Sequence, residues 1–299
     1  MPNVLMTGGT GFLGSALTRS LINRGFTVTV LSRDSNKNNP TANLKFINSL
    51  SDIGVSYNYD IFINLAGAPI FDQRWTPERK ALLRESRITT TQLLLEVMSK
   101  MSIKPKLLIS GSAIGYYGAQ ADNLVTENTK PHANFSQQLC EDWESTALEA
   151  TALGVRVCLI RTGLVIGAGG GFLQRLLFPF KLGLGGRLGS GQQWMSWIHL
   201  KDWISITLKM IDDTSMQGAY NATAPNPVTN TEFTKTLGKC LHRPTPFPVP
   251  AFILRTLLGE MSALLIDSQR VLPNRLLEMG FVFEVTELSD AINQVIHHS

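Results

Sequence analysis

The chain has few of the residues that build disulfide frameworks and metal sites. Its 299 residues include only three cysteines, Cys140, Cys158 and Cys240, and five histidines. The cysteines are odd in number and widely spaced, which fits neither a disulfide framework nor a zinc site. No His-x-x-x-His pair occurs either. We therefore expect a reduced intracellular protein with no metal centre.

Charge and long apolar stretches are also scarce. Charged residues make up 17% of the chain and hydrophobic residues 43%, which is too apolar for a disordered protein. The 27 Lys and Arg exceed the 23 Asp and Glu by only four and form no long basic run, so we expect no nucleic-acid partner. No window reaches about 18 consecutive apolar residues, and the first residues do not resemble a signal peptide. We expect no membrane partner and a location in the cytoplasm or an organelle matrix.

Short β-branched segments alternate with helical patterns through the first two thirds of the chain. Apolar residues recur every three or four positions within residues 11–24, 87–101 and 134–153, as expected of helices. Buried strands that alternate with helices predict an α/β fold, a Rossmann-type doubly wound parallel sheet covered on both faces. The expected strands are residues 3–7, 27–31, 44–47, 60–65, 106–110 and 155–160.

Beyond residue 166 the alternation is lost. Residues 167–171 and 183–191 are rich in glycine, residues 244–250 are rich in proline, and residues 268–279 and 287–297 have helical patterns. We predict a dinucleotide-binding domain over residues 1–166, and a substrate-binding lobe with a helical tail over residues 167–299.

A glycine loop directly follows the first expected strand and opens the first helix. It reads Gly8-Gly9-Thr10-Gly11-Phe12-Leu13-Gly14. Gly8 allows a sharp turn, Gly11 leaves room for a pyrophosphate, and Gly14 lets the helix pack closely on the sheet. The amides at the start of the helix face the anion. The loop predicts dinucleotide binding through Gly8, Thr10, Gly11, Phe12, Leu13 and Gly14.

The Gly-x-x-Gly-x-x-Gly spacing resembles the extended short-chain dehydrogenase/reductase family, within the NAD-dependent epimerase/dehydratase proteins. Further segments resemble that family in the same order: Asn64-Leu65-Ala66-Gly67, Ser110-Gly111-Ser112, Arg161-Thr162-Gly163-Leu164-Val165 and Trp197-Ile198-His199. Arg74-Trp75 and Ser268-Gln269-Arg270 are typical of an atypical subgroup labelled "epimerase family protein". The resemblance implies a Rossmann fold and cofactor contacts at Leu65, Ala66, Gly67, Arg87 and Val165.

The end of the second expected strand favours NADP over NAD. NAD-binding relatives have an acidic residue there, which binds both ribose hydroxyls. This chain has Ser32 followed by Arg33, and Asp34 comes one position late. A hydroxyl and a guanidinium suit the 2′-phosphate that a carboxylate would repel. We expect NADP as the cofactor.

The usual proton-transfer pair of the family is missing. The family uses a Tyr and, four residues later, a Lys, but Phe135 and Leu139 stand at those positions. Ser112 matches the family's serine. As a substitute acid we expect Tyr116 or Tyr117, which follow Ser112 closely, with Cys140, His199 and water as alternatives.

The sequence also differs from relatives that act on nucleotide sugars. Those relatives hold the sugar-nucleotide phosphates with an Arg at the position of Met195. We therefore expect a small-molecule substrate, and an NADP(H)-dependent oxidoreductase acting on a small, largely apolar carbonyl or alcohol. The main alternative is a catalytically silent NADP(H)-binding sensor, and a sugar-nucleotide epimerase is a weaker one. The oligomeric state is left open.

Overall fold

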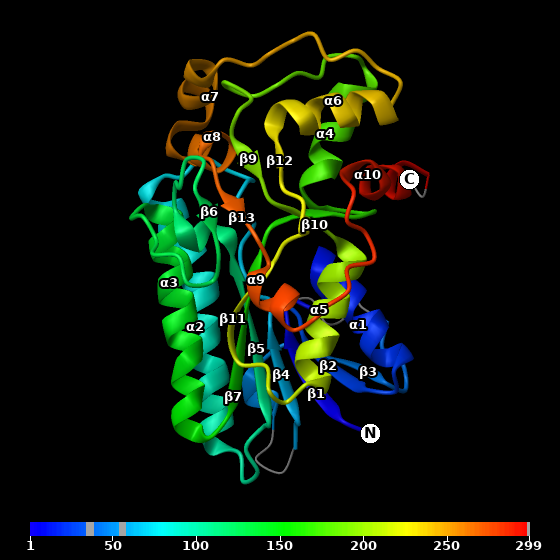
Figure 1. Cartoon of the computed structure of the whole chain (residues 1–299). Coiled ribbons are helices and arrows are strands. Elements are labelled where there is room, and N and C mark those ends of the chain that lie inside the picture. Colours follow the sequence, from blue (N-terminus) through cyan, green and yellow to red (C-terminus); the bar gives the residue numbers. More distant parts are fainter. Residues whose placement is uncertain (34–38, 54–57, 298–299) are drawn as a thin grey trace.

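A computed structural model describes residues 1–33, 39–53 and 58–297. Seven parallel strands form its main sheet in the order β11-β7-β5-β4-β1-β2-β3 (Figure 1). The order reverses between β1 and β4, and this switch point is where ligands bind in open α/β sheets. The strands are β1 (Asn3–Thr7), β2 (Thr27–Leu31), β3 (Leu44–Ile47), β4 (Ile61–Asn64), β5 (Leu107–Ala113), β7 (Arg156–Thr162) and β11 (Gly218–Ala222).

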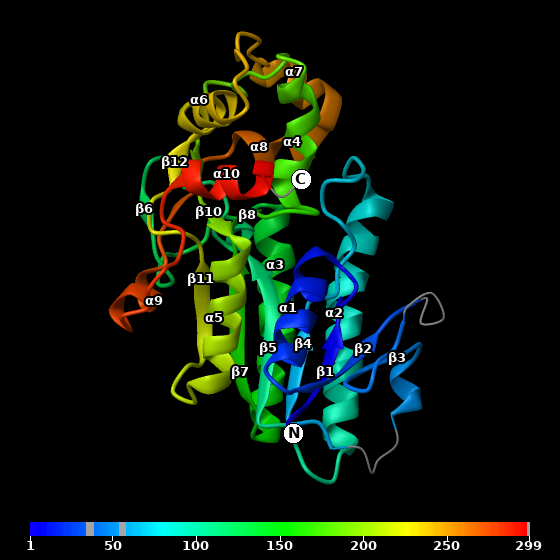
Figure 2. The same cartoon turned by 90° about the vertical axis from the view of Figure 1, so that its right-hand side faces the viewer.

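Helices cover both faces of this sheet. On one face lie α1 (Phe12–Asn23) and α5 (Leu200–Asp212), and on the other lie α2 (Pro77–Lys100) and α3 (Phe135–Leu148) (Figures 1 and 2). Alternate strand residues face the two layers, because successive side chains of a strand point to opposite sides. Val4 and Met6 belong to the core under α1 and α5, whereas Leu5 belongs to the core under α2 and α3. The predicted doubly wound α/β fold is confirmed.

A smaller lobe lies over the carboxyl edge of the sheet (Figure 1). Its own core includes the buried side chains of Trp197, Phe233, Leu237 and Ile292. Its helices are α4 (Gly171–Lys181), α6 (Asn230–Cys240), α7 (Ala251–Leu258), α8 (Ala263–Ile266) and α10 (Leu288–His297). The short α9 (Asn274–Glu278) instead packs beside β11, and its Leu276 is buried in the core of the main sheet. Three short strand pairs accompany the lobe helices: β8 (Leu164–Ile166) with β10 (Trp197–His199), β9 (Trp194–Met195) with β12 (Val228–Thr229), and β6 (Leu124–Val125) with β13 (Arg270–Val271).

Some elements differ from the expectation. The chain returns to the main sheet after residue 166, because α5 packs on the sheet and β11 is one of its edge strands. The predicted boundary at residue 166 therefore does not separate the main-sheet domain from the lobe. Residues 268–279 are not one helix, since β13 and Pro273 precede the short α9. In the part of the chain that the structure describes, no helix is long and apolar enough to span a membrane.

Candidate functional site

The glycine loop lies at the switch point of the sheet, between the carboxyl ends of β1 and β4. Gly8 has a φ of +71°, which side-chain-bearing residues rarely adopt, and a Cβ there would lie 2.5 Å from the Leu65 carbonyl oxygen. A Cβ on Gly14 would lie 2.2 Å from the Gly8 carbonyl oxygen. These two glycines hold the loop against β4 and against itself, so both are required by the fold.

Gly11 is different because the space beside it is open. A Cβ there would meet only the Gly8 carbonyl oxygen, at 3.3 Å, and the residue is exposed. Gly11 is also the N-cap of α1, with no capping side chain and no acidic residue in the first turn. The first amides of α1 are therefore open to an anion. The loop is a cradle of the shape that a dinucleotide pyrophosphate requires.

The other loop residues lie around this cradle. Thr10 is exposed beside Gly11, while Phe12 and Leu13 are half-buried. The ring of Phe12 packs under the glycine-rich segment before α4, where a Cβ on Gly170 would lie 2.6 Å from it. This contact brings the lobe directly over the glycine loop.

A chain of buried hydrogen bonds fixes the strand ends beside the loop. The Thr7 hydroxyl donates to Asn64 Oδ1 at 2.7 Å and accepts from the Ala66 amide at 3.2 Å. Asn64 Nδ2 donates to the Thr91 hydroxyl at 2.8 Å, and the Trp143 indole donates to the same hydroxyl at 3.1 Å. β1, β4, α2 and α3 are thereby tied together at the point where Leu65, Ala66 and Gly67 leave the sheet.

Ser32 and Arg33 follow β2 at the same edge. β2 is the parallel neighbour of β1, so its end lies beside the end that carries Gly8. Ser32 is buried and its amide donates to the Ile47 carbonyl at 2.9 Å, whereas Arg33 is exposed. Asp34 lies outside the described residues. The Arg33 guanidinium forms no ion pair with any residue that the structure describes, and it lies at the end of β2 where the sequence predicts recognition of the NADP 2′-phosphate.

Arg87 holds the loop after β4. Its guanidinium donates to the carbonyls of Leu83 at 3.0 Å and Ala68 at 3.2 Å, and lies 5.3 Å from the Trp143 ring centroid. Burial lowers its pKa, and a Cβ on Gly67 would lie 2.8 Å from its Cζ. Arg87 therefore supports the backbone that the family resemblance assigns to the cofactor. Val165, the last predicted contact, is buried in β8 opposite Ile198.

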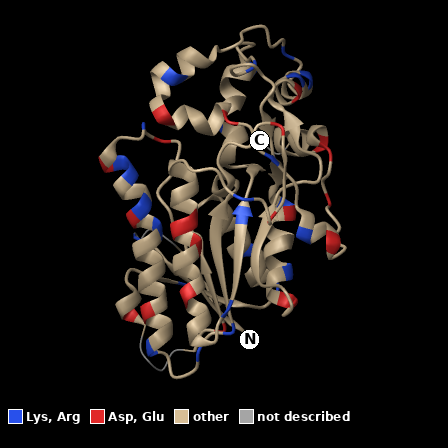
Figure 3. Ribbon diagram, turned by 60° about the vertical axis from the view of Figure 1, so that its left-hand side comes forward, with Lys and Arg blue, Asp and Glu red and all other residues tan. Residues whose placement is uncertain are grey.

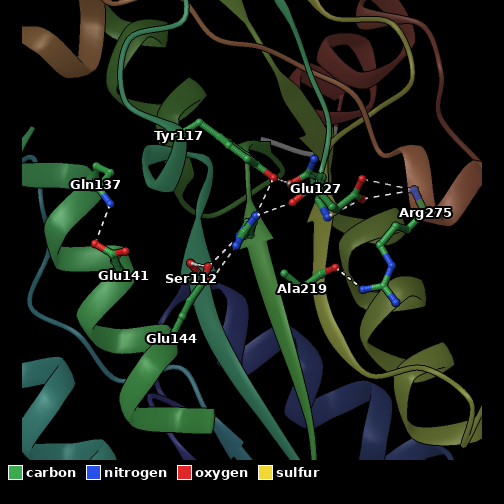
Figure 4. Close-up of polar contacts among 10 residues, drawn as sticks. Ser112, Tyr117, Glu127, Gln137, Glu141, Glu144, Ala219 and Arg275 are labelled. Atoms are coloured by element: carbon green, nitrogen blue, oxygen red, sulfur yellow. Dashed lines mark hydrogen bonds and ion pairs between the residues drawn. The ribbon is translucent and has the colours of Figure 1, made fainter. Parts of the chain in front are cut away.

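A buried polar network lies below the carboxyl ends of β5, β7 and β11 (Figure 4). Ser112, Arg161 and Asn221 are register neighbours across these strands. The Ser112 hydroxyl donates to Glu144 Oε1 of α3 at 2.6 Å. Arg161 makes two bonds of 2.8 Å to the carboxylate of Glu144, the fork geometry typical of a strong pair. Burial acts against the charge of Arg161, but Glu144 outweighs it and raises the pKa of Arg161.

The two candidate tyrosines lie in different surroundings. Tyr117 is fully buried, donates to Asn221 Oδ1 at 2.6 Å and accepts from Arg161 at 2.9 Å. Burial raises the pKa of Tyr117 to about 12 although Arg161 opposes the shift, so this hydroxyl is a poor acid at neutral pH. Tyr116 is partly exposed and its ring lies 3.5 Å from the Arg161 guanidinium. Of the two, only Tyr116 has a side chain that reaches the surface.

The positions of the missing Tyr and Lys belong to an apolar cluster. Leu139 is buried with Trp75 and Met261, and the Phe135 ring lies 4.9 Å from that of Trp75. The ammonium of Lys80 lies 4.9 Å from the Phe135 ring centroid. Phe135 and Leu139 therefore join α3 to the lobe by packing and offer no group that moves a proton.

The alternative proton donors are also buried. Burial raises the pKa of Cys140 to about 11 and lowers the pKa of His199 to about 4. His199 caps α5, because its ring accepts from the Lys201 amide. Both side chains are therefore neutral at pH 7 and are set into the fold. Among the described residues, no group of three or more His, Cys, Asp or Glu is arranged to hold a metal ion.

A cavity of about 50 Å³ lies between the sheet edge and the lobe. Met195, which the family resemblance matches to the phosphate-binding Arg of sugar-nucleotide enzymes, is in its wall. Most of its lining is apolar, with a few polar groups: Ile114, Leu164, Phe172, Leu188, Gln193, Trp194, Met195, Ser196, Asn230, Leu264, Leu265, Asp267 and Gln269. The cavity has room for only a few heavy atoms.

The hydrogen-bond partners of Ser112 and Tyr117 were not predicted from the sequence. Glu144 follows Ser112 by 32 residues and Asn221 follows Tyr117 by 104, so no local spacing connects them. One signal was present, because Arg161 directly follows the apolar residues 157–160 of a predicted buried strand, and a buried charge requires a partner.

Known proteins resemble the chain over its whole length. An epimerase family protein of Staphylococcus haemolyticus is 38% identical over 299 residues, 99% of each chain, and one of Bacillus subtilis is 37% identical over 98% of each. A human epimerase family protein solved with NADPH superposes with a TM-score of 0.89 at 32% identity, over 99% of this chain and 100% of that one. A nucleoside-diphosphate sugar epimerase of Corynebacterium glutamicum superposes with a TM-score of 0.79 at 32% identity. The superposition covers 100% of this chain and 59% of that one.

Family comparison agrees with these relatives. Residues 249–295 match a domain of unknown function, DUF1731. Residues 4–222, which include the glycine loop, the buried polar network and all seven strands of the main sheet except the first residue of β1, match the NAD dependent epimerase/dehydratase family. The chain belongs to the NAD dependent epimerase/dehydratase family, in its extended short-chain dehydrogenase/reductase form.

Proposed function

We propose that the protein is an NADP(H)-dependent oxidoreductase that acts on a small, largely apolar alcohol or carbonyl compound. The observation that carries this proposal is that an open glycine cradle and a small apolar cavity lie at the same edge of one sheet. The cradle suits a dinucleotide, and the cavity suits a small substrate beside it.

The residues present fit NADP(H). Gly11 and the uncapped start of α1 would receive the pyrophosphate, and Ser32 and Arg33 would bind the 2′-phosphate. The human relative solved with NADPH supports this choice. When bound, the nicotinamide supplies or accepts the hydride, and the remaining work belongs to residues of the chain.

Ser112 is the residue that we assign to the substrate oxygen. Its hydroxyl proton is directed to Glu144, so its lone pairs are left to accept a hydrogen bond. An alcohol O–H donates such a bond, whereas a carbonyl oxygen does not. The arrangement therefore favours a bound alcohol, whose proton would pass to Ser112 as the Ser112 proton moves to Glu144. To polarise a carbonyl, Ser112 would first have to turn away from Glu144.

The cavity argues against a sugar nucleotide. At about 50 Å³ it is far smaller than the roughly 300–1,000 Å³ of sites for larger ligands. Met195 is buried in its wall and cannot bind phosphate. Discrimination by such a site comes from apolar shape, where each methylene is worth roughly 1–3 kcal/mol.

The test is a turnover assay with a panel of small alcohols and NADP⁺, and of small aldehydes and ketones with NADPH, followed by the absorbance of NADPH. We expect slow turnover, because the usual acid–base pair contributes about 10²–10⁴ in rate. Ser112→Ala should lower kcat at least about tenfold with the affinity for NADPH unchanged. Cys158→Ala, at a buried site remote from the cavity lining, is the matched control. Equal kcat for Ser112→Ala and wild type would overturn the role of Ser112.

A silent NADP(H) sensor is the second candidate, and a specific contact favours it. Phe135 and Leu139 pack with Met261, so the helix that carries catalysis in relatives here joins the sheet to the lobe. A sensor would bind NADPH and become more resistant to proteolysis in the lobe while oxidising no member of the panel. That combination of results would replace the enzyme proposal.

A further inference from the structure

The outer end of the lobe combines basic charge with exposed apolar side chains. We define the lobe tip as residues 171–191 and 233–258, which include α4, most of α6, and α7. These two segments contain seven Lys and Arg and no Asp or Glu, although the whole chain carries a net charge of only +4. Figure 3 shows Lys and Arg at this end of the molecule together with some Asp and Glu, and Glu232 and Glu260 border the two segments.

The two segments of the lobe tip form one surface. The Val249 amide donates to the Arg187 carbonyl at 2.8 Å, and Arg243 Nε donates to the Lys181 carbonyl at 2.9 Å. Leu188 and Val249 form a parallel bridge. In Figures 1 and 2, α4, α6 and α7 lie together at the end of the molecule farthest from the N-terminus.

Large apolar side chains are exposed on this surface. Phe178 is 73% exposed and Phe252 is 68% exposed. Four more exposed side chains, Leu182, Leu184, Phe247 and Leu257, bring the lobe tip to six of the fourteen large apolar side chains that are exposed in the described residues. Such a concentration marks a surface that contacts something apolar.

Most cations of the lobe tip form no ion pair within the described residues, the exception being Arg175, which pairs with Asp72. Lys181, Arg187, Lys235, Lys239 and Arg243 are all exposed, and none of them forms an ion pair with any residue that the structure describes. Three of them line an open hollow of about 500 Å³ together with His242, and no acidic residue lines it. Unneutralised cations beside exposed phenyl rings are the combination found in proteins that bind at a lipid headgroup layer.

We propose that the lobe tip docks on an anionic lipid bilayer, with the apolar side chains entering the headgroup boundary and the basic hollow receiving lipid phosphates. A second copy of this chain is a poorer occupant, because two tips would bring two sets of unpaired cations face to face. This proposal replaces the expectation of no membrane partner, and it is independent of the oxidoreductase proposal. It requires no spanning helix.

The test measures co-sedimentation of the purified protein with vesicles of phosphatidylglycerol and, separately, of phosphatidylcholine. We expect binding to phosphatidylglycerol alone, weakened as salt is raised, because exposed charges are screened over about 10 Å at 0.1 M salt. Lys235→Glu with Lys239→Glu should lower the partition coefficient at least about thirtyfold, since each Lys near such a surface is worth about 1 kcal/mol. The pair Arg19→Glu with Lys45→Glu changes net charge equally at exposed positions outside the tip, and should retain most of the binding.

The apolar contribution has its own pair of variants. Phe178→Ala with Phe252→Ala should lower the partition coefficient at least about tenfold, through the apolar area withdrawn from the bilayer boundary. Ile103→Ala with Val282→Ala removes exposed apolar side chains elsewhere and should leave binding unchanged. Absence of binding to phosphatidylglycerol at low salt overturns the proposal. An equal loss of vesicle binding in a pair of tip variants and its control pair also overturns it. So does the finding that the wild-type protein is a dimer which the tip variants dissociate, with no vesicle binding by either.

Discussion

Tyr117 lies at the centre of the buried polar network, with both the donor and the acceptor capacity of its hydroxyl in use. Tyr117→Phe would leave Arg161 and Asn221 each without one partner, which costs about 1–3 kcal/mol of unfolding free energy. Because the pKa of Tyr117 is raised to about 12, we expect no change in turnover or in the affinity for NADPH. Urea unfolding and the turnover assay measure the two effects separately.

Tyr116→Phe is the matched variant, since its side chain reaches the surface and its ring, rather than its hydroxyl, contacts Arg161. We expect a change in stability within about 0.5 kcal/mol. Turnover should fall in Tyr116→Phe if a tyrosine supplies the proton. Loss of turnover in Tyr117→Phe with unchanged stability would show that the roles of the two residues are reversed.

His199 makes stability depend on pH. Burial, together with the smaller effect of the nearby Lys201 charge, lowers its pKa from 6.5 to about 4 against the opposing effect of Glu284. Between about pH 6.5 and pH 4, His199 is protonated in the unfolded chain but not in the folded protein. The His199 contribution to the free energy of unfolding is therefore fully present above about pH 6.5 and is lost as the pH falls toward 4. The loss attributable to His199 is about 3 kcal/mol.

The measurement is urea unfolding of wild type and His199→Asn from pH 7.5 to 4. Asparagine retains an acceptor for the cap of α5 but has no proton to gain. The difference in stability between the two proteins should shrink over this range. Parallel curves for the two proteins would mean that His199 is not responsible.

The buried network shows where residue-level prediction stops. Ser112 was predicted as the catalytic serine from its match to the family's serine, and the structure places it near the carboxyl end of β5. Its bond to Glu144 depends on how α3 crosses the sheet, which no local pattern encodes. The direction of this hydrogen bond decides whether Ser112 donates to a substrate or accepts from it. That direction could not be predicted from the sequence.

We expect opposite effects from substitutions at two glycines of the Gly8–Gly14 segment, Gly11 at the N-cap of α1 and Gly14 in its first turn. Gly14→Ala puts a methyl group 2.2 Å from the Gly8 carbonyl oxygen, so the backbone must shift and the protein should lose about 1–3 kcal/mol of stability. Gly11→Val meets only the Gly8 carbonyl oxygen, at 3.3 Å, so it should cost less stability than Gly14→Ala while abolishing NADPH binding. Urea unfolding and a fluorescence titration with NADPH distinguish the two. A folded Gly11→Val protein with wild-type affinity would place the cofactor elsewhere.

Helices and strands were predictable to different degrees. The expected strands agree with β1 to β5 and β7 within a few residues, because buried parallel strands are continuous apolar segments. α2 starts ten residues before the expected helix, since its first turns are charged and lack apolar periodicity, although Thr76 and Pro77 are a helix-start signal. In the lobe, α4 and α6 were missed because glycine and threonine weaken their patterns.

The molecule as a whole places the glycine loop, the small cavity and the lobe at one edge of the sheet. The predicted fold required only the alternation of strands and helices and one glycine loop. The return of the chain to the sheet through α5 and β11 was not predicted, because the strand at residues 218–222 is short and contains no β-branched residue. This return fixes the lobe above the carboxyl edge, where it closes the cavity.

Selection of the cofactor can be measured directly by titrating the protein with NADPH and NADH and following nicotinamide fluorescence. Ser32 and Arg33 stand where an acidic residue would select NAD, and a charge-assisted hydrogen bond contributes roughly 1.5–3 kcal/mol. We expect NADPH to bind about ten- to a hundredfold more tightly than NADH, and Arg33→Ala to lose most of that preference while binding NADH as wild type does. Equal affinities of the wild-type protein for the two cofactors, or no binding of either, would contradict an NADP(H)-dependent oxidoreductase.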